Sequence, residues 1–209
     1  MKSDAEAAGE PARASGEHGG GARARLLATA AQLFYRQGYY QTGINQIIDE
    51  AGVAKASFYN HFPSKEDLGL AYVRRRHEEW MRGLRGRVEA QETPEERLEA
   101  VFDHLEAFAT REGFRGCGQL NMAAEFPESA HRIRAQIREQ KQAVRDYLAE
   151  IVQGVTSGED ADEEEAKATA DAVYLLYEAS LVESQNFGDA WPARAARVAA
   201  RHQLGLPRK

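Results

Sequence analysis

Several features are scarce in this chain of 209 residues, and each scarcity excludes a class of protein. One cysteine cannot form an internal disulfide, so we expect a protein of the reducing cytoplasm rather than a disulfide-rich secreted one. No apolar run approaches the roughly 20 residues that span a bilayer, and the N-terminus lacks the apolar segment of a secretory signal peptide. The six histidines and the cysteine show no metal-ligand spacing, so we expect no metal and no other cofactor.

Positive charge is also in deficit, with 27 basic against 33 acidic residues and a net charge of −6. Such a deficit argues against a nucleic-acid partner, but the distribution of charge reverses that argument. Residues 22–65 hold five basic and two acidic side chains, so the excess of acid lies in the remainder of the chain. This polarity is typical of a DNA-binding head attached to an acidic body.

One stretch predicts two short helices joined by a tight turn. From Ile44 to Ala51, apolar residues recur at i, i+3, i+4 and i+7, which is one face of a helix. Gly52 interrupts the pattern, and glycine turns there at little steric cost. A second helix follows, with Phe58 and Phe62 one turn apart on its inner side. Two short helices with a glycine turn are typical of a helix-turn-helix, whose second helix enters the DNA major groove.

The residues from Thr42 to Glu66 resemble the DNA-binding signature of the TetR/AcrR transcriptional regulators, without a gap over 25 positions. Gly43 and Ala56 stand where the family more often has threonine and glycine, which bears on the operator sequence rather than on the fold. The resemblance implies an all-α protein of about nine helices. It implies an N-terminal three-helix DNA-binding head with a helix-turn-helix at about 44–63, and a larger helical body for ligand binding and dimerisation.

We therefore expect three parts along the chain. Residues 1–21 are rich in Ala, Gly, Glu and Ser and predict a flexible N-terminal arm. Residues 22–81 form the DNA-binding domain, and residues 82–209 form the C-terminal ligand-binding and dimerisation domain, which shows helical periodicity and no strand alternation. Arg23 and Arg25 could reach a phosphate or the minor groove, or could belong to a solvated tail.

Capping residues indicate where the helices begin. Thr42 is a plausible N-cap for the first helix of the helix-turn-helix, and Ser64 for the helix that links head to body. Thr93 and Glu96 form a capping box around a proline at the first helical position.

Nine residues of the head are predicted to contact DNA, and the family resemblance places contacts at the same positions. Lys55 can donate to a guanine edge or a phosphate, and the Tyr59 hydroxyl suits a phosphate. Lys65 lies at a helix N-terminus, which is itself an anion site. The alternative is an ordinary polar helix face. The full set is Thr42, Asn45, Lys55, Ala56, Ser57, Tyr59, Asn60, His61 and Lys65.

The resemblance also implies a ligand cavity and a dimer interface in the body. Aromatic and other side chains could line the cavity or simply fill the core; the candidates are Trp80, Phe102, Leu105, Phe108, Cys117, Met122, Phe126, Tyr147, Tyr174 and Tyr177. Residues 170–182 are apolar almost all round, so they need cover on two sides. With the last helix they predict half of an intersubunit four-helix bundle; the candidates are Tyr177, Leu181, Trp191, Ala195, Val198 and Ala199. The alternative is that both helices close the monomer's own core.

The leading hypothesis is a DNA-binding transcriptional regulator and not an enzyme. It would be a homodimeric cytoplasmic repressor, released from double-stranded operator DNA by a small-molecule effector whose identity the sequence does not give. One alternative is a thiol-based redox sensor or redox protein acting through Cys117, beside Arg115 in a glycine-rich loop. The structural interpretation is that Cys117 is only a small side chain packed near the cavity. A third hypothesis, a degenerate protein-interaction module, predicts loss of the recognition face, yet Lys55 and Tyr59 are present.

Overall fold

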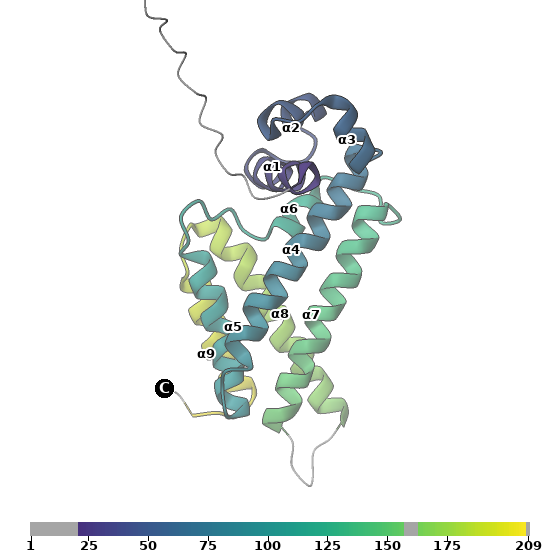
Figure 1. Ribbon diagram of the computed structural model, residues 1–209. Coiled ribbons are helices and arrows are strands. Elements are labelled where there is room, and N and C mark those ends of the chain that lie inside the picture. The colour runs from purple at the N-terminus through teal and green to yellow at the C-terminus, as the bar shows by residue number, and fades with distance from the viewer. Residues whose placement is uncertain (1–20, 157–162, 208–209) are drawn as a thin grey trace, which may run out of the picture.

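The computed structural model describes residues 21–156 and 163–207, and all regular structure within these ranges is helical (Figure 1). The expected all-α class is confirmed. The expected N-terminal arm lies outside the described residues except for Gly21. The helices in chain order are α1 (Ala22–Gln37), α2 (Ile44–Ala51), α3 (Lys55–His61), α4 (Lys65–Val88), α5 (Pro94–Ala109), α6 (Gly118–Ala124), α7 (Arg132–Thr156), α8 (Glu163–Phe187) and α9 (Trp191–Gln203).

Two of the three predicted caps are confirmed. The Ser64 hydroxyl accepts the backbone N–H of Asp67 at 3.1 Å at the start of α4. At the start of α5, the Thr93 hydroxyl accepts the N–H of Glu96 at 3.2 Å, and the Glu96 carboxylate accepts the N–H of Thr93 at 3.1 Å. Each cap satisfies N–H groups that have no partner inside the helix, so both boundaries follow from local chemistry.

The prediction that Thr42 caps α2 is wrong. Gly43 is the N-cap residue, and no side chain caps this end of α2. Thr42 is instead fully buried; its hydroxyl donates to the carbonyl of Gly38 at 2.6 Å and accepts from Gln37 at 3.2 Å. The tight turn after α1 points the Thr42 hydroxyl back toward α1, so its hydrogen bonds stabilise that turn. A buried side chain also cannot reach a DNA backbone.

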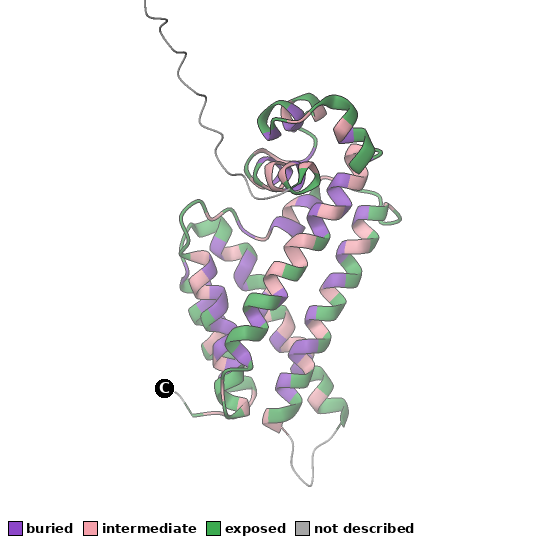
Figure 2. Ribbon diagram, in the orientation of Figure 1, coloured by how far each residue is buried: buried purple, intermediate pink, exposed green. Residues whose placement is uncertain are grey.

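The helices pack around two groups of buried apolar side chains, and Figure 2 shows the buried residues on the inner sides of the long helices. The head core includes Leu26, Phe58 and Tyr72 from α1, α3 and α4. The body core includes Leu84 and Tyr177 and lies between the second half of α4 and helices α5, α7, α8 and α9. Helix α4 contributes to both cores and therefore links the head to the body. Among the described helices, none is long and apolar enough to cross a membrane.

The head core also includes side chains from a much later part of the chain. Met122 and Phe126, from α6 and the residues after it, and Ile133 and Ile137 from the start of α7 are buried there. Phe126 packs its ring against Tyr39 with a centroid separation of 5.0 Å. The head is therefore fixed to the body through α6 and α7 as well as through α4.

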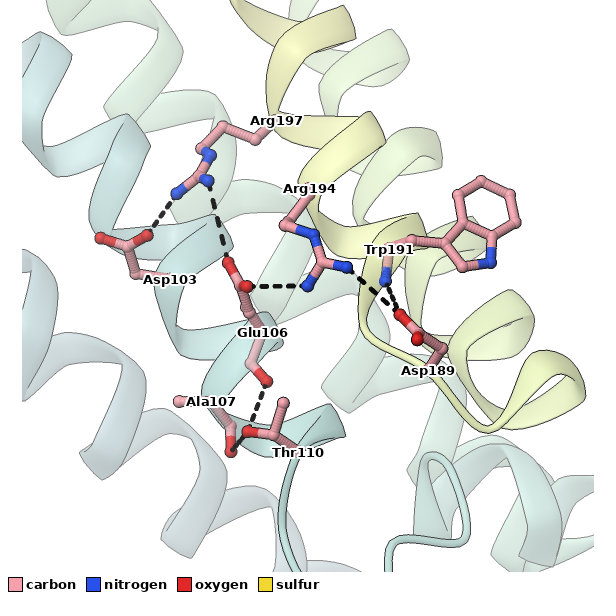
Figure 3. A network of polar contacts seen from close by, with 8 residues as sticks. All are labelled: Asp103, Glu106, Ala107, Thr110, Asp189, Trp191, Arg194 and Arg197. Carbon is pink, nitrogen blue, oxygen red and sulfur yellow. Dashed lines mark hydrogen bonds and ion pairs between the residues drawn. The ribbon is translucent and has the colours of Figure 1, made fainter. Parts of the chain in front are cut away.

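Arginines of α9 hold that helix against α5 in a series of ion pairs (Figure 3). Arg197 contacts Asp103 at 2.5 Å, and Arg194 contacts Glu106 at 3.0 Å. Arg194 also reaches Asp189, just before α9, at 3.3 Å. Surface ion pairs of this kind each contribute little to the free energy of unfolding. Because Arg194 and Arg197 both point toward α5, they nevertheless fix the rotation of α9 about its axis. The side of α9 opposite these arginines consequently faces away from α5.

Candidate nucleic-acid interface and effector cavity

Helices α2 and α3 meet through a glycine in the left-handed conformation. Gly52 has φ 60° and ψ 46°, and the following N–H, of Val53, donates to the carbonyl of Ile48 at 3.2 Å. A residue with a Cβ is strained at this φ, which is why the apolar pattern has to stop at a glycine. The turn directs Phe58 of α3 inward, where its side chain is fully buried.

Burial of Phe58 turns the remaining side chains of α3 toward solvent. Lys55, Ala56, Tyr59, Asn60 and His61 are exposed and Ser57 is partly exposed. Asn45 on α2 is exposed as well. Lys55 forms no ion pair with the residues that the structure describes, so its ammonium group is available to an external anion. Eight of the nine predicted DNA-contact residues are thus exposed or partly exposed, and the exception is Thr42.

Basic side chains of α1 and α4 flank the two helices. Arg23 places its guanidinium 5.2 Å from the ring centroid of Phe62, and Arg25 donates to the carbonyl of Ala51 at 3.3 Å. Lys65 holds its ammonium 4.2 Å from the ring centroid of Tyr39. Burial lowers the pKa of Lys65, and the carboxylate of Glu125 partly offsets this effect. These contacts place the three cations at the C-terminal end of α3, at the end of α2 and beside the turn between α1 and α2.

A carboxylate from α6 holds the turn between α1 and α2. Glu125, the C-terminal cap residue of α6, accepts the N–H of Tyr39 through Oε1 and the N–H of Tyr40 through Oε2, both at 2.7 Å. Gly38 has φ 94°, and a Cβ at that position would lie 3.0 Å from the same Oε1. The glycine thus lets the carboxylate approach the backbone closely. Nothing in the sequence around Glu125 indicates this contact, because its partners lie 85 and 86 residues away.

The segment just before α6 binds the head too. The Tyr35 hydroxyl accepts the N–H of Arg115 at 2.7 Å and donates to the carbonyl of Gly116 at 3.1 Å. The guanidinium of Arg115 donates to the carbonyl of Tyr35 at 2.7 Å. Helix α6 is therefore flanked by two polar contacts with the head, one near each end.

The first turn of α6 also forms one wall of a small cavity in the body, of about 30 Å³. That volume is sufficient for a water molecule but not for an organic molecule. The Trp80 indole N–H donates to the Tyr177 hydroxyl at 2.6 Å across the cavity. The lining residues are Arg76, Trp80, Phe108, Cys117, Gly118, Gln119, Lys141, Val144, Tyr177 and Leu181.

Four of the ten predicted ligand-pocket residues line this cavity: Trp80, Phe108, Cys117 and Tyr177. Phe102 and Leu105 are buried in the body core away from it, and Tyr174 packs beside Tyr177. Tyr147 lies against Arg85 in a separate surface pocket. Met122 and Phe126 belong to the head core, so their assignment to the ligand pocket is corrected. Gln119 and Lys141 line the cavity but carry no pattern in the sequence that marks them.

An ion pair borders the cavity next to the cysteine. The ammonium of Lys141 contacts the Glu178 carboxylate at 2.6 Å and lies 3.9 Å from the Cys117 sulfur. Burial lowers the pKa of Lys141, but its electrostatic interactions with Cys117 and Glu178 and its hydrogen bond to Glu178 outweigh burial, so the pKa is raised overall. Lys141 therefore remains a cation at the cavity wall and is already paired with a carboxylate.

The predicted dimer residues divide into two groups. Trp191, Ala195, Val198 and Ala199 are exposed on α9, on the side turned away from α5. Tyr177 and Leu181 are 1% and 4% exposed and point into the body core, so they cannot meet a second chain. The outer side of α8 instead presents Leu175, which is 65% exposed, together with Ala179 and Val182. Helix α8 is apolar all round because it has one side in the core and another on this outer face.

Comparison with known proteins agrees with the geometry. The regular structure of the described residues is all helical, and the exposed polar second helix of a helix-turn-helix is typical of the helix-turn-helix class of DNA-binding proteins. Residues 26–72 match the family described as bacterial regulatory proteins, tetR family, and residues 94–200 match the tetracyclin repressor-like C-terminal domain. The chain belongs to the TetR family of transcriptional regulators.

Individual relatives share parts of the chain. The transcriptional regulator LmrA of Bacillus subtilis is 38% identical over 108 residues, which are 51% of this chain and 57% of LmrA. The transcriptional repressor NemR of Escherichia coli is 27% identical over 138 residues, 65% of this chain and 68% of NemR. The crystal structure of SCO4454, a TetR-family regulator from Streptomyces coelicolor, superposes with a TM-score of 0.80 at 27% identity and covers 88% of this chain and 94% of that one.

Proposed function

We propose that this regulator is a homodimeric repressor that binds double-stranded operator DNA through α3 and leaves it when a small molecule enters the body. The proposal rests on the exposed polar face of α3. The buried Phe58 side chain anchors this helix, and Lys55 forms no ion pair with the described residues. Among the relatives, NemR and DhaR are repressors by name, whereas FasR, 36% identical over 88 residues, is an activator by name.

Each exposed residue of the head has a role that its chemistry suits. Lys55, at the start of α3, donates to a guanine edge or to a phosphate. Tyr59 donates its hydroxyl to a phosphate, and Lys65 lies at the N-terminus of α4, where anions are favoured. Hydrogen bonds and contacts along the groove and the flanking backbone come from Asn45, Ala56, Ser57, Asn60 and His61.

Dimerisation through α8 and α9 supports operator recognition, because an operator with two half-sites is bound by two heads. Leu175 and Val198 are 65% and 57% exposed and face the same surface groove between α8 and α9. An exposed apolar groove of this kind is stabilised when a second copy covers it. A two-fold dimer then presents two α3 helices to successive major grooves, which lie roughly 34–36 Å apart.

The effector acts by enlarging the cavity. An organic molecule cannot enter about 30 Å³ without moving the walls, which belong in part to α4 and to the first turn of α6. Both helices also contact the head, α4 by continuity and α6 through Glu125. A ligand that prefers the expanded state by a few kcal/mol shifts the population away from the DNA-binding spacing. Effector and operator then weaken each other's binding by equal factors.

Variants of α3 test the DNA-binding part of this proposal. The duplex used is the region upstream of the protein's own gene, and affinity is measured by band shift. Lys55→Ala is expected to weaken binding about tenfold, the scale of one base or phosphate contact, and Tyr59→Phe somewhat less. Lys167→Ala, the same change on an exposed lysine of α8, is the control and is expected to bind as wild type. Wild-type affinity in both α3 variants would contradict the assignment.

A second candidate function, thiol-based sensing, rests on the Lys141 ammonium 3.9 Å from the Cys117 sulfur at the cavity wall. A neighbouring cation stabilises negative charge that develops on sulfur when the thiol reacts. The test compares wild type with Cys117→Ser after mild hydrogen peroxide treatment. Release of DNA by the treated wild type alone supports sensing, whereas equal DNA binding by both treated proteins removes this candidate.

A further inference from the structure

His104 on α5 is a buried polar side chain without a partner. It is 5% exposed, and both of its ring nitrogens lack a hydrogen-bond partner among the described residues. Buried polar groups are nearly always paired, so an imidazole with two unpaired nitrogens requires an explanation. Burial, with smaller contributions from Arg87 and Arg111, lowers the pKa of His104 to about 4, so the ring is neutral near pH 7. A neutral imidazole has one nitrogen that donates and one that accepts.

The surroundings of His104 are shaped around the ring. The Trp80 ring meets it edge to face with a centroid separation of 4.5 Å. On the same helix as Trp80, position 83 is a glycine, and a Cβ there would lie 3.0 Å from Cε1 of His104. A larger residue at Gly83 would therefore crowd the imidazole. The helix surface opposite His104 leaves space for the ring but offers it no polar partner.

Trp80 separates His104 from the cavity. Its indole lines the cavity together with Phe108, one turn along α5 from His104, and packs on the Phe108 ring at a centroid separation of 4.9 Å. One hydrogen bond, to the Tyr177 hydroxyl, holds the indole N–H. His104 does not line the cavity, but rotation of the Trp80 side chain, which contacts both, would extend the cavity to the imidazole.

Charge on the walls indicates what such an enlarged site would accept. Lys141 is paired with Glu178 at 2.6 Å, and Arg76 lies 3.6 Å from Glu79, a carboxylate that Arg75 also contacts at 2.7 Å. Because both cations already lie beside carboxylates, an anionic ligand would gain little counter-charge and would lose its hydration, and a cationic ligand would be repelled. A neutral ligand with an apolar ring avoids that cost and packs against the aromatic wall.

We propose that the effector site extends past Trp80 to His104 and takes a neutral aromatic molecule whose hydroxyl group donates a hydrogen bond to the imidazole. This inference rests on the proposed effector-controlled function and adds the ligand class and its polar anchor. The Tyr177 hydroxyl, which accepts from Trp80 in this structure, is a second polar group at the same wall. Phenolic compounds have the required combination of a flat apolar ring and a single donor.

The test measures the binding of phenol and of toluene, a matched pair of similar shape, to the full-length protein by calorimetry. Comparing the phenol-to-toluene affinity ratio between wild type and His104→Phe cancels the different solubilities of the two probes. The ratio is expected to fall about tenfold in His104→Phe, the scale of one buried hydrogen bond. His104→Gln keeps a donor and an acceptor group, so it is expected to retain most of the phenol-to-toluene affinity ratio. It provides a second variant for the test if His104→Phe does not fold.

Two results would overturn the inference. One is an unchanged ratio in a folded His104→Phe; the other is no binding of either probe to wild type up to the solubility of toluene. Both measurements are made without DNA, so neither result depends on operator binding. Conversely, a wild type that binds phenol through His104 but no DNA would contradict the proposed function and leave the ligand site intact.

Discussion

Substitution of Glu125 is the most direct way to perturb the contact between body and head. Its carboxylate accepts two backbone N–H groups of the α1–α2 turn, each at 2.7 Å. Hydrogen bonds to a charged group contribute about 1.5–3 kcal/mol each when buried. Tyr39 is 6% exposed, so its N–H has little access to replacement water, whereas the exposed N–H of Tyr40 is readily solvated. We therefore expect Glu125→Ala to lower the free energy of unfolding by about 2 kcal/mol, mainly through Tyr39.

The assay is urea unfolding of the full-length protein followed by circular dichroism. All variants are compared at one protein concentration, because the stability of a dimer depends on concentration. Glu125→Gln keeps one acceptor oxygen and is expected to lose about half as much as Glu125→Ala. Glu128→Ala, an exposed glutamate three residues further on, is the control and should change the free energy by less than about 0.5 kcal/mol. Equal stability of Glu125→Ala and Glu128→Ala would refute the reasoning.

Three further predictions follow from single side chains. The folded pKa of His104, about 4, lies below its ordinary 6.5, so its contribution to stability is complete above pH 6.5 and is lost as the pH falls toward 4. Wild type should therefore lose about 2 kcal/mol more than His104→Phe between pH 7 and pH 5 in urea unfolding. Leu175→Glu should give a folded monomer in sedimentation velocity, since Leu175 is 65% exposed in one chain; a dimer would remove this face as the interface. Ser64→Ala should cost about 1 kcal/mol in thermal unfolding through loss of the α4 cap, and an unchanged midpoint would contradict that role.

Local patterns in the sequence predicted much of the fold. The helix-turn-helix follows from the spacing of isoleucines before Gly52, and its turn requires the left-handed φ that glycine tolerates. The starts of α4 and α5 follow from Ser64 and Thr93, whose partners lie three residues away. These features depend on neighbours in the chain, so sequence spacing contains the necessary information.

Contacts between distant segments could not be predicted in this way. Thr42 has the residue type of an N-cap, but the tertiary turn directs its hydroxyl into the head. Met122 and Phe126 would be apolar whether they lined a ligand pocket or filled the head core, and only the packing of α6 on α1 and α4 places them in the head core. An apolar residue on α8 faces the core or a partner, and periodicity alone does not distinguish the two faces when both are apolar. The sequence therefore predicts Tyr177 and Leu181 in the dimer interface, whereas the structure buries both in the core and exposes Leu175.

Selection of bound duplexes from a random-sequence pool tests the central claim, that two α3 helices of a dimer read DNA, most directly. The account predicts enrichment of inverted repeats whose half-sites are centred about 10 base pairs apart or a multiple of that distance. Lys55→Ala, selected in parallel, should enrich the same spacing with a relaxed preference at one position of each half-site. If the wild-type protein enriches no sequence above the starting pool, or enriches sites without two-fold symmetry, the claim is contradicted.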